Sequence, residues 1–287
     1  MPVTPEQATR AFLDACETEL AALKPGNVHI HRAGHGMTVE DFRTSARVAA
    51  EPLCIPPRRL VGVRIREAVA ATRAAVGCNT NLGIVLLAAP LIAAAETAPD
   101  RATLHARLQA VLDGLTVEDA AAAYEAIRIA NPAGLGSAAA QDVASPPTVT
   151  LRAAMALAAD RDRVARQYAS GYEDVFSLGV AGIETLLAAG HDPAWTAALV
   201  HMDFLATFPD SHIARKHGAA TAEAVRAEAA ALRRHAGPDE LTETLKNFDF
   251  ELKQRGINPG TSADLTVASL LAVSLRHNLL TGEAENP

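Results

Sequence analysis

The sequence predicts an all-α protein, and three observations support this fold class. Alanine is the dominant residue, aromatic residues make up only 4% of the chain, and no segment shows the alternating pattern of a half-buried strand. Prolines and glycines fall between segments whose apolar residues recur at helical spacing. We therefore expect a single multi-helix bundle domain that spans residues 1–287.

The first two helices are marked by their end residues. Thr4 can cap a helix that continues until it reaches Pro25. Thr38, followed three residues later by Asp41, has the form of a capping box and predicts the start of a second helix. A histidine-rich loop joins these helices, and the proline cluster at 52–57 ends the second.

The remaining helices follow from apolar residues at helical spacing, as in 59–76. The strongly apolar stretch 82–95 falls short of the ~20 residues that cross a bilayer, so it is interpreted as a buried helix. The irregular segment 131–147 is a candidate active-site loop, because long loops without regular structure usually serve function. Further helices are predicted over 101–112, 116–129, 148–158, 161–187, 193–208, 221–235, 238–255 and 262–279.

Composition limits the classes of function. A formal net charge of -7 gives no general attraction to nucleic acid or to an anionic membrane, so a polyanionic ligand must meet a local cationic site. Three cysteines without zinc-site spacing suggest neither a disulfide framework nor a structural metal. The polar N-terminus lacks the apolar core of a signal peptide, so we expect a cytoplasmic protein. Alanine-rich helices would permit a homodimer but do not show one.

Four polar clusters stand at junctions between predicted helices. They are 24–29 (KPGNVH), 77–83 (GCNTNLG), 209–218 (PDSHIARKHG) and 258–265 (NPGTSADL). In this order they resemble the triphosphoribosyl-dephospho-CoA synthase family, whose members carry a KPG segment, an NT-x-x-G junction, a DS or DT segment followed by Arg and Gly, and a near-terminal PGGSADLL string. The resemblance covers roughly residues 15–275 and implies an all-α transferase.

The family's chemistry implies displacement at the ribose C1′ of ATP, with release of adenine and transfer of the triphosphoribosyl unit to the 2′-hydroxyl of 3′-dephospho-CoA. It also implies Mg²⁺ bound with the ATP. The sequence departs from the family pattern at Asn81 and Leu82, which stand where the family has His and Lys, and at Thr261, which replaces a glycine. The stretch 131–143 is more similar to the archaeal and methylotroph branch of the family.

These departures leave three hypotheses open. The first is the transferase that acts on 3′-dephospho-CoA. The second is a paralogue that acts on another phosphorylated or ribosylated acceptor in tetrahydromethanopterin or methylofuran one-carbon cofactor biosynthesis. The third is a non-catalytic helical nucleotide-binding protein.

Displacement at an anomeric carbon needs carboxylates, a base for the incoming hydroxyl and neutralised phosphates. Asp210 and Asp264 are the predicted catalytic residues, although each could also stabilise a helix N-terminus. Glu67, Asp142 and Asp264 are the predicted Mg²⁺ ligands; Glu67 also fits a solvated helix face, and Asp142 an Asx-turn. We expect five of the predicted site residues to meet at one mouth of the bundle: Lys24, Glu67, Asn79, Asp210 and Asp264. The predicted substrate-binding and phosphate-binding residues are Lys24, Gly26, His29, Asn79, Thr80, Arg215, Lys216, Asn258, Gly260 and Ser262.

Several of these residues also have an ordinary structural explanation. Lys24 would complement the negative end of a helix dipole, and histidines in a polar loop are often simply exposed. Asn79 and Thr80 can cap the next helix while they bind a ligand. Cys78 is interpreted as a small packed residue, because this chemistry needs no thiol.

Overall fold

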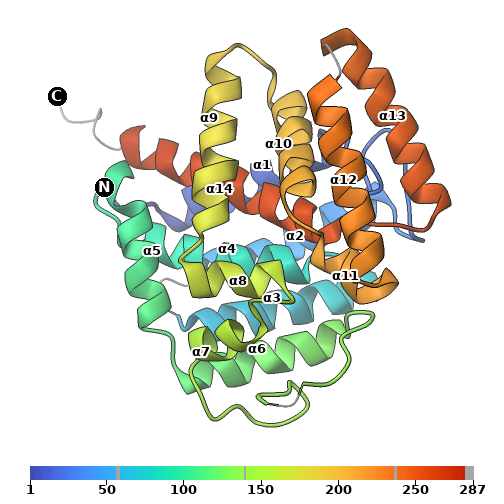
Figure 1. Cartoon of the computed structure of the whole chain (residues 1–287). Coiled ribbons are helices and arrows are strands. Elements are labelled where there is room, and N and C mark those ends of the chain that lie inside the picture. Colours follow the sequence, from blue (N-terminus) through green and yellow to red (C-terminus); the bar gives the residue numbers. More distant parts are fainter. Residues whose placement is uncertain (56–58, 139, 236–237, 282–287) are drawn as a thin grey trace.

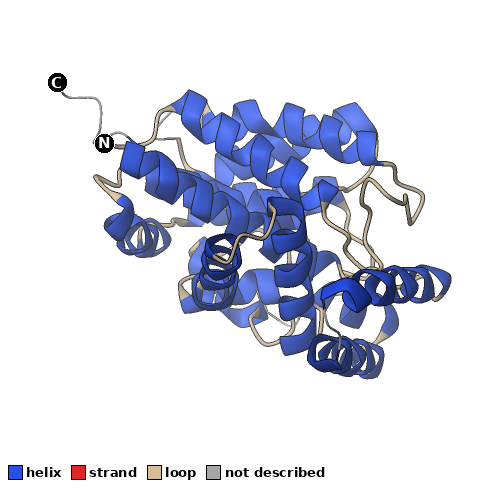
Figure 2. Ribbon diagram, turned by 90° about the horizontal axis from the view of Figure 1, so that it is seen from above, coloured by secondary structure: helices blue, strands red, loops and turns tan. Residues whose placement is uncertain are grey.

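The computed structural model describes residues 1–55, 59–138, 140–235 and 238–281, and these residues fold into helices joined by loops without any strand (Figures 1 and 2). The predicted all-α class is confirmed. A 3-10 turn, Arg101–Thr103, precedes the fifth helix. The α-helices are α1 (Pro5–Ala21), α2 (Val39–Cys54), α3 (Val61–Val76), α4 (Leu82–Ala95), α5 (Leu104–Asp113), α6 (Val117–Ala130), α7 (Leu151–Ala158), α8 (Arg163–Ser170), α9 (Ala181–Ala188), α10 (Pro193–Thr207), α11 (Ser211–His217), α12 (Ala219–His235), α13 (Pro238–Gln254) and α14 (Gly260–Thr281).

The C-terminal helix α14 organises the bundle. It packs against α1, α4 and α10 within the largest hydrophobic core. In Figure 1 it crosses the middle of the molecule, with α9, α10, α12 and α13 on one side and α3, α4, α6, α7 and α8 on the other. A second apolar cluster, which includes Met202, Val225 and Leu252, joins α10, α12 and α13. The N-terminal end of α14 therefore lies where the two halves of the bundle meet.

Helix α4 is almost wholly buried, as its apolar sequence predicts. Pro90 lies inside it and has no N–H group, so the carbonyl of Leu86 lacks its usual helical donor. The hydroxyl of Tyr168 donates to that carbonyl at 2.6 Å, and Tyr172 donates to the carbonyl of Leu87 at 3.0 Å. These bonds fix α8 and the turn after it against α4. Among the residues placed by the structure, no helix is both long enough and apolar enough to cross a membrane.

The helix predicted over 161–187 is wrong, because the chain breaks in the middle of it. Helix α8 ends at Gly171 and Tyr172, which both have positive φ, and a π-helical turn, Val175–Val180, leads into α9. The carbonyl of Gly171 accepts a hydrogen bond from Gln109 at 2.8 Å, and a Cβ at Gly171 would overlap the side chain of Gln109. The break therefore depends on a contact with α5, and the local apolar spacing did not reveal it.

Candidate active site

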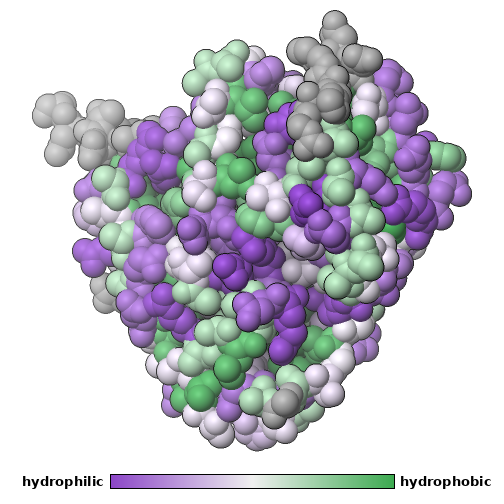
Figure 3. Space-filling model, in the orientation of Figure 1, coloured by the Kyte–Doolittle hydropathy of each residue, from purple (hydrophilic) through white to green (hydrophobic). Residues whose placement is uncertain are grey.

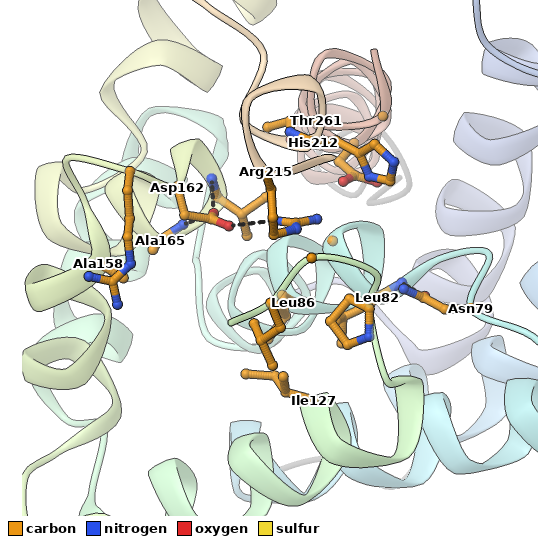
Figure 4. Close-up of a pocket in the computed structure, with 18 of the residues that line it drawn as sticks. Asn79, Leu82, Leu86, Ile127, Ala158, Asp162, Ala165, His212, Arg215 and Thr261 are labelled. Atoms are coloured by element: carbon orange, nitrogen blue, oxygen red, sulfur yellow. Dashed lines mark hydrogen bonds and ion pairs between the residues drawn. The ribbon is translucent and has the colours of Figure 1, made fainter. Parts of the chain in front are cut away.

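A cavity of about 450 Å³ lies between the two halves of the bundle (Figure 4). The N-terminal ends of α4, α8 and α14 line it, together with residues of α1 and α11 and the loop between α6 and α7. In Figure 4, Asn79 and Leu82 lie at one end, Ala158 and Ala165 lie at the other, and Arg215 lies between them. Helix N-termini carry partial positive charge, so this arrangement favours an anionic ligand.

The surface around α8 combines polar and apolar residues. On the face of Figure 3, hydrophilic residues gather across the middle, over α8, and hydrophobic residues are exposed below them, over α7. Leu135 and Leu157, which line the cavity, are 43% and 56% exposed, respectively. A ligand would therefore meet polar groups and an apolar border together.

Asp264 is the distinctive carboxylate of the cavity. It is partly exposed there, and no described residue donates a hydrogen bond to it. Burial, followed by the negative charges of Asp210 and Glu19, raises the pKa of Asp264 well above its ordinary value, whereas Arg215 acts in the opposite direction. The surroundings of this carboxyl group therefore favour its protonated form.

Glu19 of α1 also lines the cavity and forms a buried ion pair with Lys24. Burial raises the pKa of Glu19 above its ordinary value, and the positive charge of Lys24 partly offsets this. Lys24 also donates to Asn27 Oδ1 at 3.3 Å, and Asn27 Nδ2 donates to Asn258 Oδ1 at 2.8 Å. Lys24 itself does not line the cavity, but it contacts Glu19 and Asn27, which do.

Asp210 lies behind the cavity wall and is 2% exposed. Its Oδ1 accepts hydrogen bonds from the backbone N–H groups of His212 and Ile213, at 2.9 and 3.1 Å. Its Oδ2 accepts from the backbone N–H and the hydroxyl of Ser262, at 2.8 and 2.9 Å. The carboxylate thus caps α11, as one interpretation of the sequence predicted, and ties it to α14. Its predicted catalytic role remains a prediction.

The first and last sequence clusters meet at Gly26. Its φ is +79°, and a Cβ there would lie 2.9 Å from both the carbonyl oxygen of Ile257 and the ring of Pro259. The N–H of Gly26 donates to Asp249 at 3.0 Å, and His29 Nε2 lies 3.3 Å from the same carboxylate. Gly26 and His29 therefore lie behind the cavity and do not line it.

The remaining predicted binding residues divide between the cavity and the exterior. Asn79, Thr80, Asn258 and Gly260 line the cavity, and Asn79 Oδ1 also accepts a hydrogen bond from the N–H of Leu82 at 3.2 Å, in the capping role foreseen for it. Arg215 lines the cavity as well, whereas Lys216 is exposed outside it.

Two arginines supply the positive charge of the cavity. Arg215 donates to the carbonyl of Ala133 at 3.1 Å and lies 3.3 Å from Asp162 Oδ2, so its guanidinium already has partners within the protein. Arg161 lines the cavity, is exposed, and forms no side-chain hydrogen bond or ion pair with any described residue. Its guanidinium is therefore available for the phosphates of a ligand.

The predicted metal ligands are not gathered into one cluster. No group of three or more His, Cys, Asp or Glu side chains in the described part of the chain is arranged to hold a metal ion. Glu67 lies on α3 outside the cavity lining and pairs with Arg59. Asp142 lines the cavity and accepts hydrogen bonds from the N–H groups of Ala138 and Ala144, which form a turn and lower its pKa. Only Asp142 and Asp264 of the three line the cavity.

Four cavity residues with acidic or basic side chains were not predicted from the sequence. Glu19 lacks a local signal, because only the fold buries it beside Lys24. Arg161 and Asp162 were hidden inside the predicted long helix, although aspartate is a typical helix-capping residue and Asp162 caps α8. His212 lies within the third sequence cluster and could have been found there; burial, followed by the charge of Arg215, lowers its pKa to about 4.

Comparisons with known proteins bear on this site. The family model for ATP:dephospho-CoA triphosphoribosyl transferase, CitG, matches residues 5–282. A crystal structure from Archaeoglobus fulgidus, of a protein provisionally described as a triphosphoribosyl-dephospho-CoA synthase, is similar with a TM-score of 0.62. That match has 20% sequence identity and covers 83% of this chain and 98% of the other, so it supports the fold. No curated protein matches the chain.

Proposed function

Because the chain belongs to the ATP:dephospho-CoA triphosphoribosyl transferase family, whose members transfer the triphosphoribosyl unit of ATP to dephospho-CoA, we propose that this transfer takes place in the cavity around Asp264. The chain is accordingly an ATP-dependent transferase. The observation that carries the proposal is the Asp264 carboxyl group, which faces the cavity, has a raised pKa and receives no hydrogen bond from the described residues. Such a group is available to a substrate.

The reaction requires two proton movements. The bond between C1′ of the ATP ribose and N9 of adenine breaks, and a bond forms between C1′ and the acceptor's hydroxyl oxygen. Adenine gains a proton as it leaves, and the hydroxyl group loses one. One protonated acid and one base near C1′ would balance both changes.

Asp264 and Glu19 have environments that suit these two roles. Asp264 lies among negative charges that favour its protonated form, so it is the proposed acid for the departing adenine. Glu19 has a cationic partner in Lys24, which favours its ionised form, so it is the proposed base for the hydroxyl group. In this scheme Asp210 is a positioning residue, because it anchors Ser262 two residues before Asp264.

The shape of the cavity suggests how a nucleotide lies in it. Leu86, Ile127 and Met155 form an apolar wall that would accommodate the flat adenine ring. Arg161 and the N-terminal end of α8 lie at the same side of the cavity as Ala158 and can receive phosphate oxygens. Enclosure by the loop between α6 and α7 would reduce the access of water to C1′.

Magnesium enters this proposal with ATP as part of the substrate. A protein-bound cluster fits the structure poorly, because the described residues form no set of three metal-ligating side chains and both oxygens of Asp142 accept backbone hydrogen bonds. Mg²⁺ commonly keeps several waters and is held by substrate phosphates with one or two carboxylates. Its contribution would be to neutralise the triphosphate, and the proton transfers above do not depend on it.

A second acceptor is a candidate because of one observation. Leu82, which stands where the family has Lys, lines the cavity, and so does Asn81, whose side-chain amide donates to the hydroxyl of Thr72 at 3.1 Å. Leucine cannot provide the charge that lysine would offer to a phosphate. This wall therefore also fits a less anionic ribosylated acceptor, such as a one-carbon cofactor precursor.

The proposal is tested by incubation of the protein with ATP, Mg²⁺ and 3′-dephospho-CoA. We expect free adenine and a product whose mass equals the acceptor plus the triphosphoribosyl unit. Release of ADP would instead indicate a kinase. If adenine appears only with a one-carbon cofactor precursor, that precursor is the acceptor and dephospho-CoA is not. If no adenine appears with either acceptor although nucleotide binds, the proposal is refuted.

A further inference from the structure

The transfer reaction has two nucleotide substrates, but the cavity has room for only one of them to be enclosed. Its volume of about 450 Å³ is in the range of sites that enclose one drug-sized ligand. The reacting hydroxyl group of the acceptor must approach Asp264 and Glu19, so its phosphate arm must extend beyond the cavity. A second surface is therefore needed for those phosphates.

A basic hollow of about 370 Å³ lies on the other side of the segment that joins α1 to α2. It is lined by Arg32 and His35 of that segment and by Phe250, Lys253 and Gln254 of α13. In Figure 1 this blue segment runs beside α13, and the hydrogen bond from Lys253 to the carbonyl of Arg32, at 3.2 Å, joins the two. No acidic residue lines the hollow.

The hollow keeps a net positive charge after the ion pairs of its own cations are counted. Asp249 lies behind it, and its carboxylate is 2.8 Å from Lys253 Nζ but 3.8 Å from Arg32. One carboxylate thus neutralises one of the two cations, and the side chain of Arg32 is 48% exposed. The ring of Phe250 is also exposed and lies 5.3 Å from the Arg32 guanidinium. A cation beside an exposed aromatic ring suits a phosphate ester with an organic arm.

The segment that joins α1 to α2 lines both sites, since Asn27 and Met37 line the cavity and Arg32 and His35 line the hollow. Burial, followed by nearby positive charges that include Lys216, lowers the pKa of both His35 in the hollow and His212 in the cavity. His35 Nε2 lies 2.7 Å from the carbonyl oxygen of Gly26, directly before the cavity residue Asn27. The phosphate arm of an acceptor that reacts in the cavity could therefore extend over this segment to the hollow.

We propose that the hollow formed by Arg32, His35, Phe250 and Lys253 binds the diphosphate arm of the acceptor while its hydroxyl group reacts in the cavity. The ligand chemistry is a polyphosphate ester. The inference rests on the proposed function for the identity of the acceptor. Arg32 and Lys253 contact the phosphate oxygens, and the ring of Phe250 packs against the organic group that follows them.

The test measures the KM for each substrate and the binding of dephospho-CoA alone. Arg32→Gln should raise the KM and the Kd for dephospho-CoA about tenfold and leave the KM for ATP unchanged. Arg47→Gln is a matched control, because Arg47 is an exposed arginine on α2 that pairs with Glu40 outside both sites. It should change neither constant.

Three results would overturn the inference. An increased KM for ATP alone would assign the hollow to the triphosphate of ATP, and unchanged constants in Arg32→Gln would remove the site. An equal effect in Arg47→Gln would show that general surface charge, and not this hollow, affects the binding of dephospho-CoA. Binding of dephospho-CoA needs no catalysis, so an Arg32-dependent Kd without adenine release would refute the proposed function and leave the site intact.

Discussion

The carboxylate of Asp264 at the start of α14 lies directly against Gly83 at the start of α4. A Cβ built on Gly83 would overlap Oδ2 of Asp264 and crowd its Cγ. The second and fourth sequence clusters, which are separated by more than half of the chain, therefore meet through this contact. Glycine at position 83 lets the carboxyl group occupy the cavity wall.

Gly83→Ala should displace the Asp264 carboxyl group and lower the rate of adenine release at least ~100-fold, because catalytic groups tolerate little misplacement. Helical content should remain, since alanine favours a helix more than glycine does. The matched control is Gly182→Ala in α9, where a Cβ would make an ordinary 3.4 Å contact with Val200. Full activity of Gly83→Ala would show that the contact does not position the carboxyl group.

Asp264→Asn should change how stability depends on pH. The pKa of Asp264 is raised in the folded chain, so the folded state holds a proton that the unfolded state releases above about pH 4. Wild-type stability should fall as pH rises from there toward the folded pKa. The Tm of Asp264→Asn relative to wild type should therefore increase with pH.

Asp142→Asn provides a control of opposite sign. Backbone hydrogen bonds lower the pKa of Asp142, so its contribution to stability is present above about pH 4 and is lost as pH falls through the folded pKa. The Tm of Asp142→Asn relative to wild type should decrease as pH rises. Parallel pH trends in the two variants would contradict the environments assigned here.

Lys24→Met should destabilise the fold by about 3 kcal/mol, because it leaves Glu19 buried without its charged partner. The double variant Glu19→Leu with Lys24→Met should regain most of that stability, since an apolar pair can replace a buried ion pair. Urea unfolding measures both changes. The double variant should still lack activity, because Glu19 is the proposed base; an active double variant would exclude that role.

The local features of the fold could be predicted from the sequence. The predicted cap at Thr4 and the predicted capping box at Thr38 are present, and Asp210 caps α11, because a cap depends on a few neighbouring residues. The break at Gly171 could not be predicted, since the side chain of Gln109, distant in the sequence, occupies the space beside it. Tertiary contacts of this kind leave no periodic signal.

The candidate site was predictable to a similar extent. The sequence clusters placed Asn79, Asn258 and Asp264 at the cavity, because their motifs lie at helix junctions that meet in space. Lys24 and Asp210 were correctly placed near it, but only the folded chain shows that they do not line it and instead contact Glu19 and Ser262. Glu67 was predicted to lie at the site but lies outside the cavity lining, because one turn of an amphipathic helix does not reveal which side faces a ligand.

Asp264 is proposed to act in the bond-breaking step, and this role can be measured by single-turnover release of adenine. The assay compares wild type with Asp264→Asn and with Asp113→Asn, whose carboxylate is 69% exposed at the end of α5. We expect Asp264→Asn to be at least ~100-fold slower while it remains folded and binds ATP, and Asp113→Asn to match wild type. Adenine release by folded Asp264→Asn at the wild-type rate would show that Asp264 does not act in the bond-breaking step.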